Sequence, residues 1–140
     1  MKFDTSFTIK GKSAEDVFDF VAEPENGTKW AGSAKEITAE GEPGVGRKIK
    51  AKVDLIKTFE ITQTVDVFDR PTAYSFSASS PIKIRYDFAF AADGDGTKVN
   101  CAIDADPGKF IPGGGILLKG TFKKLFNSDM KRLEAALNEG

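Results

Sequence analysis

Apolar and polar residues alternate along most of this chain with a period of two, which is typical of β-strands that bury one face. Turn-forming residues at 43–46, 69–71 and 93–96 separate several of the alternating segments. Because no helical period comes between them, they predict an antiparallel sheet of hairpins rather than parallel βαβ units. We expect strands over residues 3–9, 34–40, 49–55, 59–67, 74–78, 82–90 and 99–105.

Three other segments show helical features. Ser13 precedes two acidic residues and an apolar face, which is the pattern of a capped helix, and Pro24 ends it. A short helical turn after it is expected to bring Trp30 to the edge of the core. From 116 to 137 the apolar period becomes about 3.6 residues, which predicts a long helix with one broad apolar face that packs on a sheet.

These elements predict one α+β domain over residues 1–140, because a chain of 140 residues is too short for two well-filled cores. Their order is one strand, two short helices, six strands and a long C-terminal helix. We expect a curved antiparallel sheet of about seven strands that wraps around the C-terminal helix. Within segment 59–67, the alternation places every second residue, from Phe59 to Val67, on the inner face of this sheet.

Composition argues against several classes of partner. Lys and Arg number 20 against 21 Asp and Glu, so the chain lacks the basic excess that nucleic-acid binders use to neutralise phosphates. No apolar run approaches membrane-spanning length, and the first residues lack the apolar core of a secretion signal. The single cysteine, Cys101, fits a reducing compartment, so we expect a cytoplasmic protein that neither binds nucleic acid nor inserts into a membrane.

The chain contains no histidine, which is the commonest general base at neutral pH and the commonest metal ligand. No other set of residues forms a recognisable catalytic motif. We therefore expect no metal and no cofactor, and the balance favours a protein that is not an enzyme.

Several local motifs, taken in order, are similar to those of one known superfamily. The stretch 14–26 followed by Trp30 resembles the opening of the START-like, polyketide cyclase/dehydrase superfamily, also called SRPBCC. Residues 44–46, 65–71 and 95–99 resemble further landmarks of that superfamily, so the similarity covers essentially the whole chain. The resemblance implies a helix-grip fold, with a cavity between sheet and long helix that commonly holds lipids, sterols, quinones or polyketides.

Under this interpretation, the inward-facing residues predict the wall of a ligand pocket. They are mostly aromatic and aliphatic, which suits a flat or greasy molecule, although the same residues would equally form a filled hydrophobic core. The expected pocket residues are Phe7, Trp30, Val53, Phe59, Ile61, Gln63, Phe76, Tyr86, Phe88, Val99, Cys101, Phe110, Phe122, Phe126 and Asp129.

Three polar members of this set are weak candidates for catalysis or for orienting a ligand. Gln63 and Tyr86 carry hydrogen-bonding groups on the inner face, although a backbone partner or solvent would also satisfy them. At 100° per residue, Asp129 and Lys119 both fall within the apolar arc of the last helix, Lys119 alongside Leu137. Asp129 either faces the cavity or bonds a neighbouring element, and Lys119 is expected to snorkel at the pocket mouth.

The residues just before the last helix predict a lid at that mouth. Pro112, Gly113, Gly114 and Gly115 give the backbone freedom that a lid needs, although a plain flexible connector would show the same composition.

Three functions remain open at this point. The leading hypothesis is a protein that binds, carries or senses a small hydrophobic molecule. The alternative is an enzyme similar to polyketide cyclases or dehydratases, in which Tyr86, Gln63 and Asp129 act as acid, orienting group and base. The third is a protein-interaction or assembly module, which a collapsed pocket beside an exposed apolar patch would favour.

Overall fold

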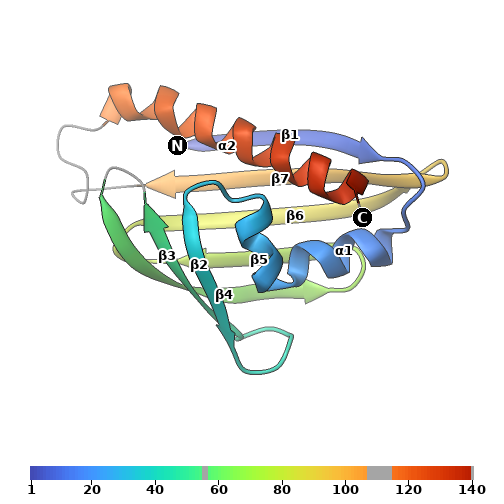
Figure 1. Ribbon diagram of the computed structural model, residues 1–140, viewed down its shortest axis with the longest axis horizontal. Helices are drawn as coiled ribbons and strands as arrows, with labels where there is room; N and C mark the ends of the chain where they lie inside the picture. Colours follow the sequence, from blue (N-terminus) through green and yellow to red (C-terminus); the bar gives the residue numbers. More distant parts are fainter. Residues whose placement is uncertain (55–56, 107–114, 140) are drawn as a thin grey trace.

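The computed structural model describes residues 1–54, 57–106 and 115–139, and its main feature is one seven-stranded antiparallel sheet (Figure 1). The strands lie in the order β1-β7-β6-β5-β4-β3-β2, so the first strand of the chain pairs with the last. Their bounds are β1 Lys2–Ile9, β2 Ala34–Glu40, β3 Lys48–Asp54, β4 Thr58–Asp69, β5 Ala73–Ala78, β6 Lys83–Asp93 and β7 Gly96–Asp106.

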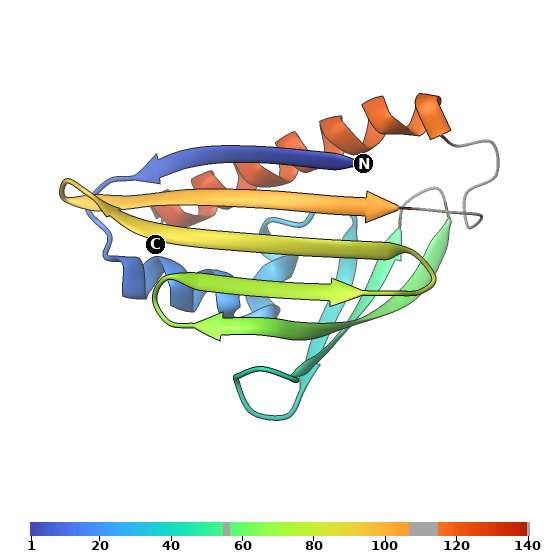
Figure 2. The same ribbon diagram turned by 180° about the vertical axis from the view of Figure 1, so that it is seen from behind.

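Three helical segments cover one face of this sheet, and the view from behind shows the other face bare (Figure 2). They are α1 (Ala14–Ala22), the short 3-10 helix η1 (Pro24–Lys29) and the long α2 (Gly115–Glu139). The sheet curves around them, which confirms the helix-grip fold predicted from the sequence. Gly115, which was expected in the link before the last helix, is instead the first residue of α2.

Local chemistry accounts for the element boundaries. The Ser13 hydroxyl accepts a hydrogen bond from the Asp16 backbone N–H at 3.2 Å, which caps α1 as its sequence predicts. Asp93 pairs with Gly96 across the β6–β7 hairpin, and Gly94 in the turn has a φ of 60°, a conformation that glycine adopts without strain.

A β-bulge in β4 corrects the predicted inner face of that strand. Val65 pairs with Phe76 of β5, but Val67 pairs with Ser75, so the register shifts by one residue between them. Val67 therefore shares the outer face with Ser75, and Phe68 takes the inner position. The centroid of the Phe68 ring lies 5.2 Å from that of the Phe18 ring. Strict alternation from Phe59 to Val67 was a wrong prediction beyond Val65 because it assumed an unbroken ladder.

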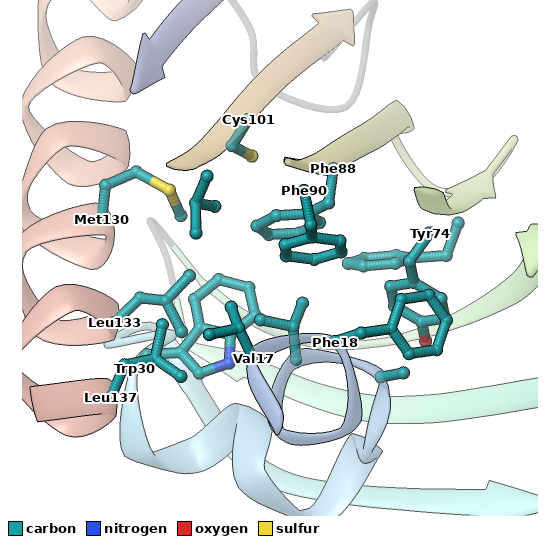
Figure 3. Close-up of a cluster of buried hydrophobic side chains, with 14 of the residues drawn as sticks. Val17, Phe18, Trp30, Tyr74, Phe88, Phe90, Cys101, Met130, Leu133 and Leu137 are labelled. Carbon is teal, nitrogen blue, oxygen red and sulfur yellow. The ribbon is translucent and has the colours of Figure 1, made fainter. Parts of the chain in front are cut away.

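One end of the space between the sheet and the helices is occupied by a cluster of buried apolar side chains. We call it the packed region; α1, the C-terminal half of α2 and the strands β6 and β7 meet there (Figure 3). Phe18 of α1 is fully buried, and the parallel rings of Phe88 and Phe90 lie beside it, with Leu133 projecting from α2. The region consists of Ile9, Val17, Phe18, Phe88, Phe90, Val99, Cys101, Met130, Leu133 and Leu137.

Candidate functional site

The other half of this space contains a cavity of about 140 Å³. Its wall has three parts: the end of α1 with η1 and the loop that follows it, the inner faces of β2 to β6 with one residue of β7, and one face of α2. The residues of the wall are Val21, Glu23, Pro24, Gly27, Trp30, Ala31, Ser33, Ala34, Ile37, Ile49, Ala51, Val53, Phe59, Ile61, Gln63, Tyr74, Phe76, Ile82, Ile84, Tyr86, Ile103, Phe122, Leu125, Phe126 and Asp129.

Most of the pocket residues expected from sequence lie together in this wall. Strand alternation placed the sheet members and the helical period of α2 placed its members, because both periods fix which side chains share a face. Trp30 was expected there from the short helical turn that precedes it. The expected residues found in the wall are Trp30, Val53, Phe59, Ile61, Gln63, Phe76, Tyr86, Phe122, Phe126 and Asp129.

Four expected residues lie elsewhere. Phe88, Val99 and Cys101 are fully buried in the packed region, because α1 covers that end of the sheet and leaves no space over them. Phe7 of β1 is half-buried and packs against the same core rather than the cavity. Phe110 lies outside the described residues.

The predicted mouth is only partly described. Lys119 is exposed on the first turns of α2. Gly115 begins that helix, which removes it from the proposed lid, and Pro112, Gly113 and Gly114 lie outside the described residues.

Several wall residues were not among those expected. Ile49, Ala51 and Ile84 follow the same alternation that selected their neighbours, so the signal for them was present in the sequence. Gly27 and Ala31 belong to η1 and its loop, where no periodicity tells inward from outward positions. Only the three-dimensional packing of η1 against β2 brings them to the wall.

Aromatic rings form one side of the cavity. Phe76 and Tyr86 stack with their centroids 4.8 Å apart, and Trp30 meets Tyr86 edge to face at 6.4 Å. Trp30 is 5% exposed, and its indole N–H has no hydrogen-bond partner in the described part of the chain. This side of the cavity therefore offers broad apolar faces.

Asp129 of α2 is the only buried carboxylate among the described wall residues, with 7% of its surface exposed. Its Oδ1 accepts hydrogen bonds from the backbone N–H of Gly32 at 2.9 Å and from Nη1 of Arg132 at 3.0 Å. A Cβ atom at position 32 would overlap the Arg132 guanidinium, so glycine allows this arrangement. Asp129 therefore does both things considered for it: it lines the cavity, and it accepts a hydrogen bond from Gly32 in the loop after η1.

Burial changes the acidity of the polar groups in the wall. It raises the pKa of Asp129, although the hydrogen bond from Gly32 and the charge of Arg132 oppose the change. Burial also raises the pKa of Tyr86 well above its ordinary range, with a smaller contribution from the nearby charge of Asp129, and it raises the pKa of Tyr74 to about 12. Both tyrosines therefore keep their hydroxyl protons at neutral pH.

The opposite face of the sheet has a second, polar hollow of about 900 Å³. Its charged groups largely bond one another: Arg85 contacts Asp66 at 3.5 Å and Asp87 at 3.0 Å, and Ser77 donates to Asp66.

Within the described ranges, no three Cys, Asp or Glu residues are grouped to hold a metal ion. Within the same ranges, no helix has the length and apolarity needed to cross a membrane.

Comparison with known proteins agrees with this architecture. The sequence matches the family described as polyketide cyclase/dehydrase and lipid transport over residues 1–138. The chain belongs to this family. Among curated proteins, a search by sequence found no match.

Several proteins with solved structures share the fold at low sequence identity. A START superfamily protein from Mycobacterium smegmatis is 14% identical, with a TM-score of 0.81 over 99% of this chain and 97% of its own. A protein from Thermus thermophilus is 15% identical, with a TM-score of 0.80 over 99% and 95% of the two chains. Ara h 8.0201 is 18% identical, with a TM-score of 0.73 over 100% and 99%. At these identities the likeness establishes the fold and leaves the ligand to be determined.

Proposed function

We propose that this protein binds, carries or senses a small hydrophobic molecule, such as a lipid, a quinone or a polyketide, in the cavity between the sheet and α2. The observation that carries the proposal is the cavity itself, which lies beside a fully packed core and is lined mainly by apolar side chains. A largely apolar cavity with a few polar groups is the usual form of a small-molecule site. We place this activity in the cytoplasm, without nucleic acid or membrane insertion.

The apolar wall of the cavity supports this proposal. A ligand that covers this wall removes apolar surface from water, which contributes about 25 cal/mol for each Å² buried. The family description, which includes lipid transport, points in the same direction.

Native mass spectrometry tests the proposal with the gently purified full chain. We expect a stoichiometric adduct that is released when the protein is denatured. Ala51→Phe places a ring where a small side chain now lines the cavity, so it should abolish the adduct, whereas Ala91→Phe, an exposed site on β6, should retain it. An empty cavity, with no thermal shift across lipids, quinones and polyketides, would refute the proposal.

A second candidate function has one specific observation in its favour. A buried carboxyl with a raised pKa beside a tyrosine hydroxyl is an arrangement found in acid–base enzymes, and Asp129 with Tyr86 matches it. If the protein turns over a polyketide, Asp129→Asn should abolish the reaction while ligand still binds. The interaction-module hypothesis lacks comparable support, because Val45, at 70% exposure, stands alone as an exposed large apolar side chain in the described residues.

A further inference from the structure

The charged groups of the cavity wall are all acidic. Asp129 contributes a buried carboxylate and Glu23 an exposed one that caps η1, whereas no Lys or Arg belongs to the wall in the described part of the chain. Arg132 is the cation nearest to Asp129, but its side chain is half exposed and its bond goes to Oδ1. A ligand inside the cavity therefore meets negative charge without a basic residue to pair with.

Asp129 has one oxygen left to bind such a ligand. Its Oδ1 is saturated by Gly32 and Arg132, while no described residue donates a hydrogen bond to Oδ2. Oδ2 is not among the fully enclosed unsatisfied atoms of the described residues, so it keeps surface that the donor of a ligand can reach. A hydrogen bond to a charged acceptor contributes more than one between neutral groups.

Building on the proposed function, we infer that the cavity selects apolar molecules whose polar end donates a hydrogen bond and bears no negative charge. Hydrophobic alcohols, phenols and amines meet this requirement. Fatty acids and other carboxylates do not, because they would bring a second negative charge beside Asp129 in a desolvated space.

The surroundings of Asp129 agree with this selectivity. Three groups face it from the elements packed around it: the Arg132 guanidinium on α2, the Gly32 backbone N–H, and the Tyr86 ring on β6. Tyr86 and Trp30 present ring faces and edges to the same cavity, and such rings also favour a cationic amine over an anion.

Four probes with the same ring system test the inference by isothermal titration calorimetry on the full chain at pH 7. They are 2-ethylnaphthalene, 2-(2-naphthyl)ethanol, 2-(2-naphthyl)ethylamine and 2-naphthylacetate. We expect the alcohol and the amine to bind about tenfold more tightly than the hydrocarbon, because each adds one hydrogen bond to a charged acceptor. We expect the acetate to bind more weakly than all three.

The outcomes separate this inference from the proposed function. If none of the probes binds, the proposed function fails. If all four bind equally, or the acetate binds best, the cavity is a ligand site but the selectivity inferred for it is wrong.

Asp129→Asn provides the residue-level test, because asparagine still offers Oδ1 to Gly32. The alcohol and amine should lose about tenfold in affinity and the acetate should gain, while Glu134→Gln on the same helix should leave the ranking unchanged. An unchanged ranking in a folded Asp129→Asn protein, checked by circular dichroism, would also overturn the inference. The ranking of the unmodified protein stands as a test even if the variant does not fold.

Discussion

The packed region and the cavity are built from the same sheet and the same helix, yet one is filled and the other is hollow. In the packed region a complete helix, α1, packs the ring of Phe18 against the rings of Phe68, Tyr74 and Phe90 on the sheet. Over the cavity the covering element is the short η1 with its loop, which contributes small residues such as Gly27, Ala31 and Ser33. The difference shows that the sheet supplies an apolar face everywhere, and the covering helix decides whether that face is filled.

The largest effect should come from removing the central ring of the packed region. Phe18 is fully buried among apolar neighbours, so Phe18→Ala should lower the free energy of unfolding by about 3–5 kcal/mol. The matched change in the cavity wall, Phe122→Ala, should cost about 1 kcal/mol, since that half-buried side chain already borders empty space. Urea unfolding measures both, and equal losses would show that the two regions are packed alike.

Enlarging a side chain should also destabilise the packed region more than the cavity wall. Val99→Phe forces extra volume into a fully buried position and should cost about 1–3 kcal/mol. Ala51→Phe has the cavity to enter, so its cost in unfolding free energy should be smaller while ligand binding is lost. Thermal unfolding with and without ligand compares them; a larger loss for Ala51→Phe would mean that the cavity is not available to side chains.

The pH dependence of stability should show the buried carboxyl of the cavity. The folded-state pKa of Asp129 lies above its ordinary value of 3.8, so the folded protein retains this proton to higher pH than the unfolded chain. The contribution of Asp129 to the free energy of unfolding is therefore complete below pH 3.8, and it is lost as the pH rises through the folded-state pKa of this carboxyl.

Comparison with Asp129→Asn isolates this contribution from those of other carboxyls. Arg70 and Arg85 lower the pKa values of Asp19 and Asp87, so these two groups make stability fall as the pH falls, but they do so equally in both proteins. In urea titrations from about pH 4 to pH 7, the unmodified protein should gain stability relative to the variant as the pH falls. A difference that is constant with pH, or that grows as the pH rises, would contradict the burial assigned to Asp129.

The smallest effect should come from an ion pair at the border of the packed region. Arg70 donates two hydrogen bonds to Asp19 of α1, at 2.7 and 2.8 Å, but both side chains are about half exposed. Arg70→Gln should therefore lower the free energy of unfolding by less than about 1 kcal/mol, and by less still in high salt. A loss comparable to that of Phe18→Ala would mean that ion pairing, rather than burial, holds α1 in place.

Sequence periodicity predicted the strands, the long helix and nine of the 25 residues of the cavity wall, for a physical reason. Each regular element repeats its own geometry, so alternation identified Ile61 and Tyr86, and the helical angle identified Asp129. Periodicity could not show that Phe88 and Cys101 lie under α1 while Tyr74 borders the cavity, because all of them occupy inner positions of their strands.

The remaining features depend on contacts between distant parts of the chain. The hydrogen bond between Gly32 and Asp129 joins residues 97 positions apart, and no local pattern indicates it. The bulge in β4 likewise depends on pairing with β5, and it reverses the faces of Val67 and Phe68.

The central claim, that the hollow half of the molecule is a ligand site, is tested most directly by backbone amide and indole NMR during titration with 2-(2-naphthyl)ethanol. We expect saturable shift changes at the indole N–H of Trp30 and along the inner positions of β3, β4 and β5, with little change at Phe18, Phe90 and Val99 in the packed region. An absence of saturable changes, or changes centred on the packed region, would contradict the account.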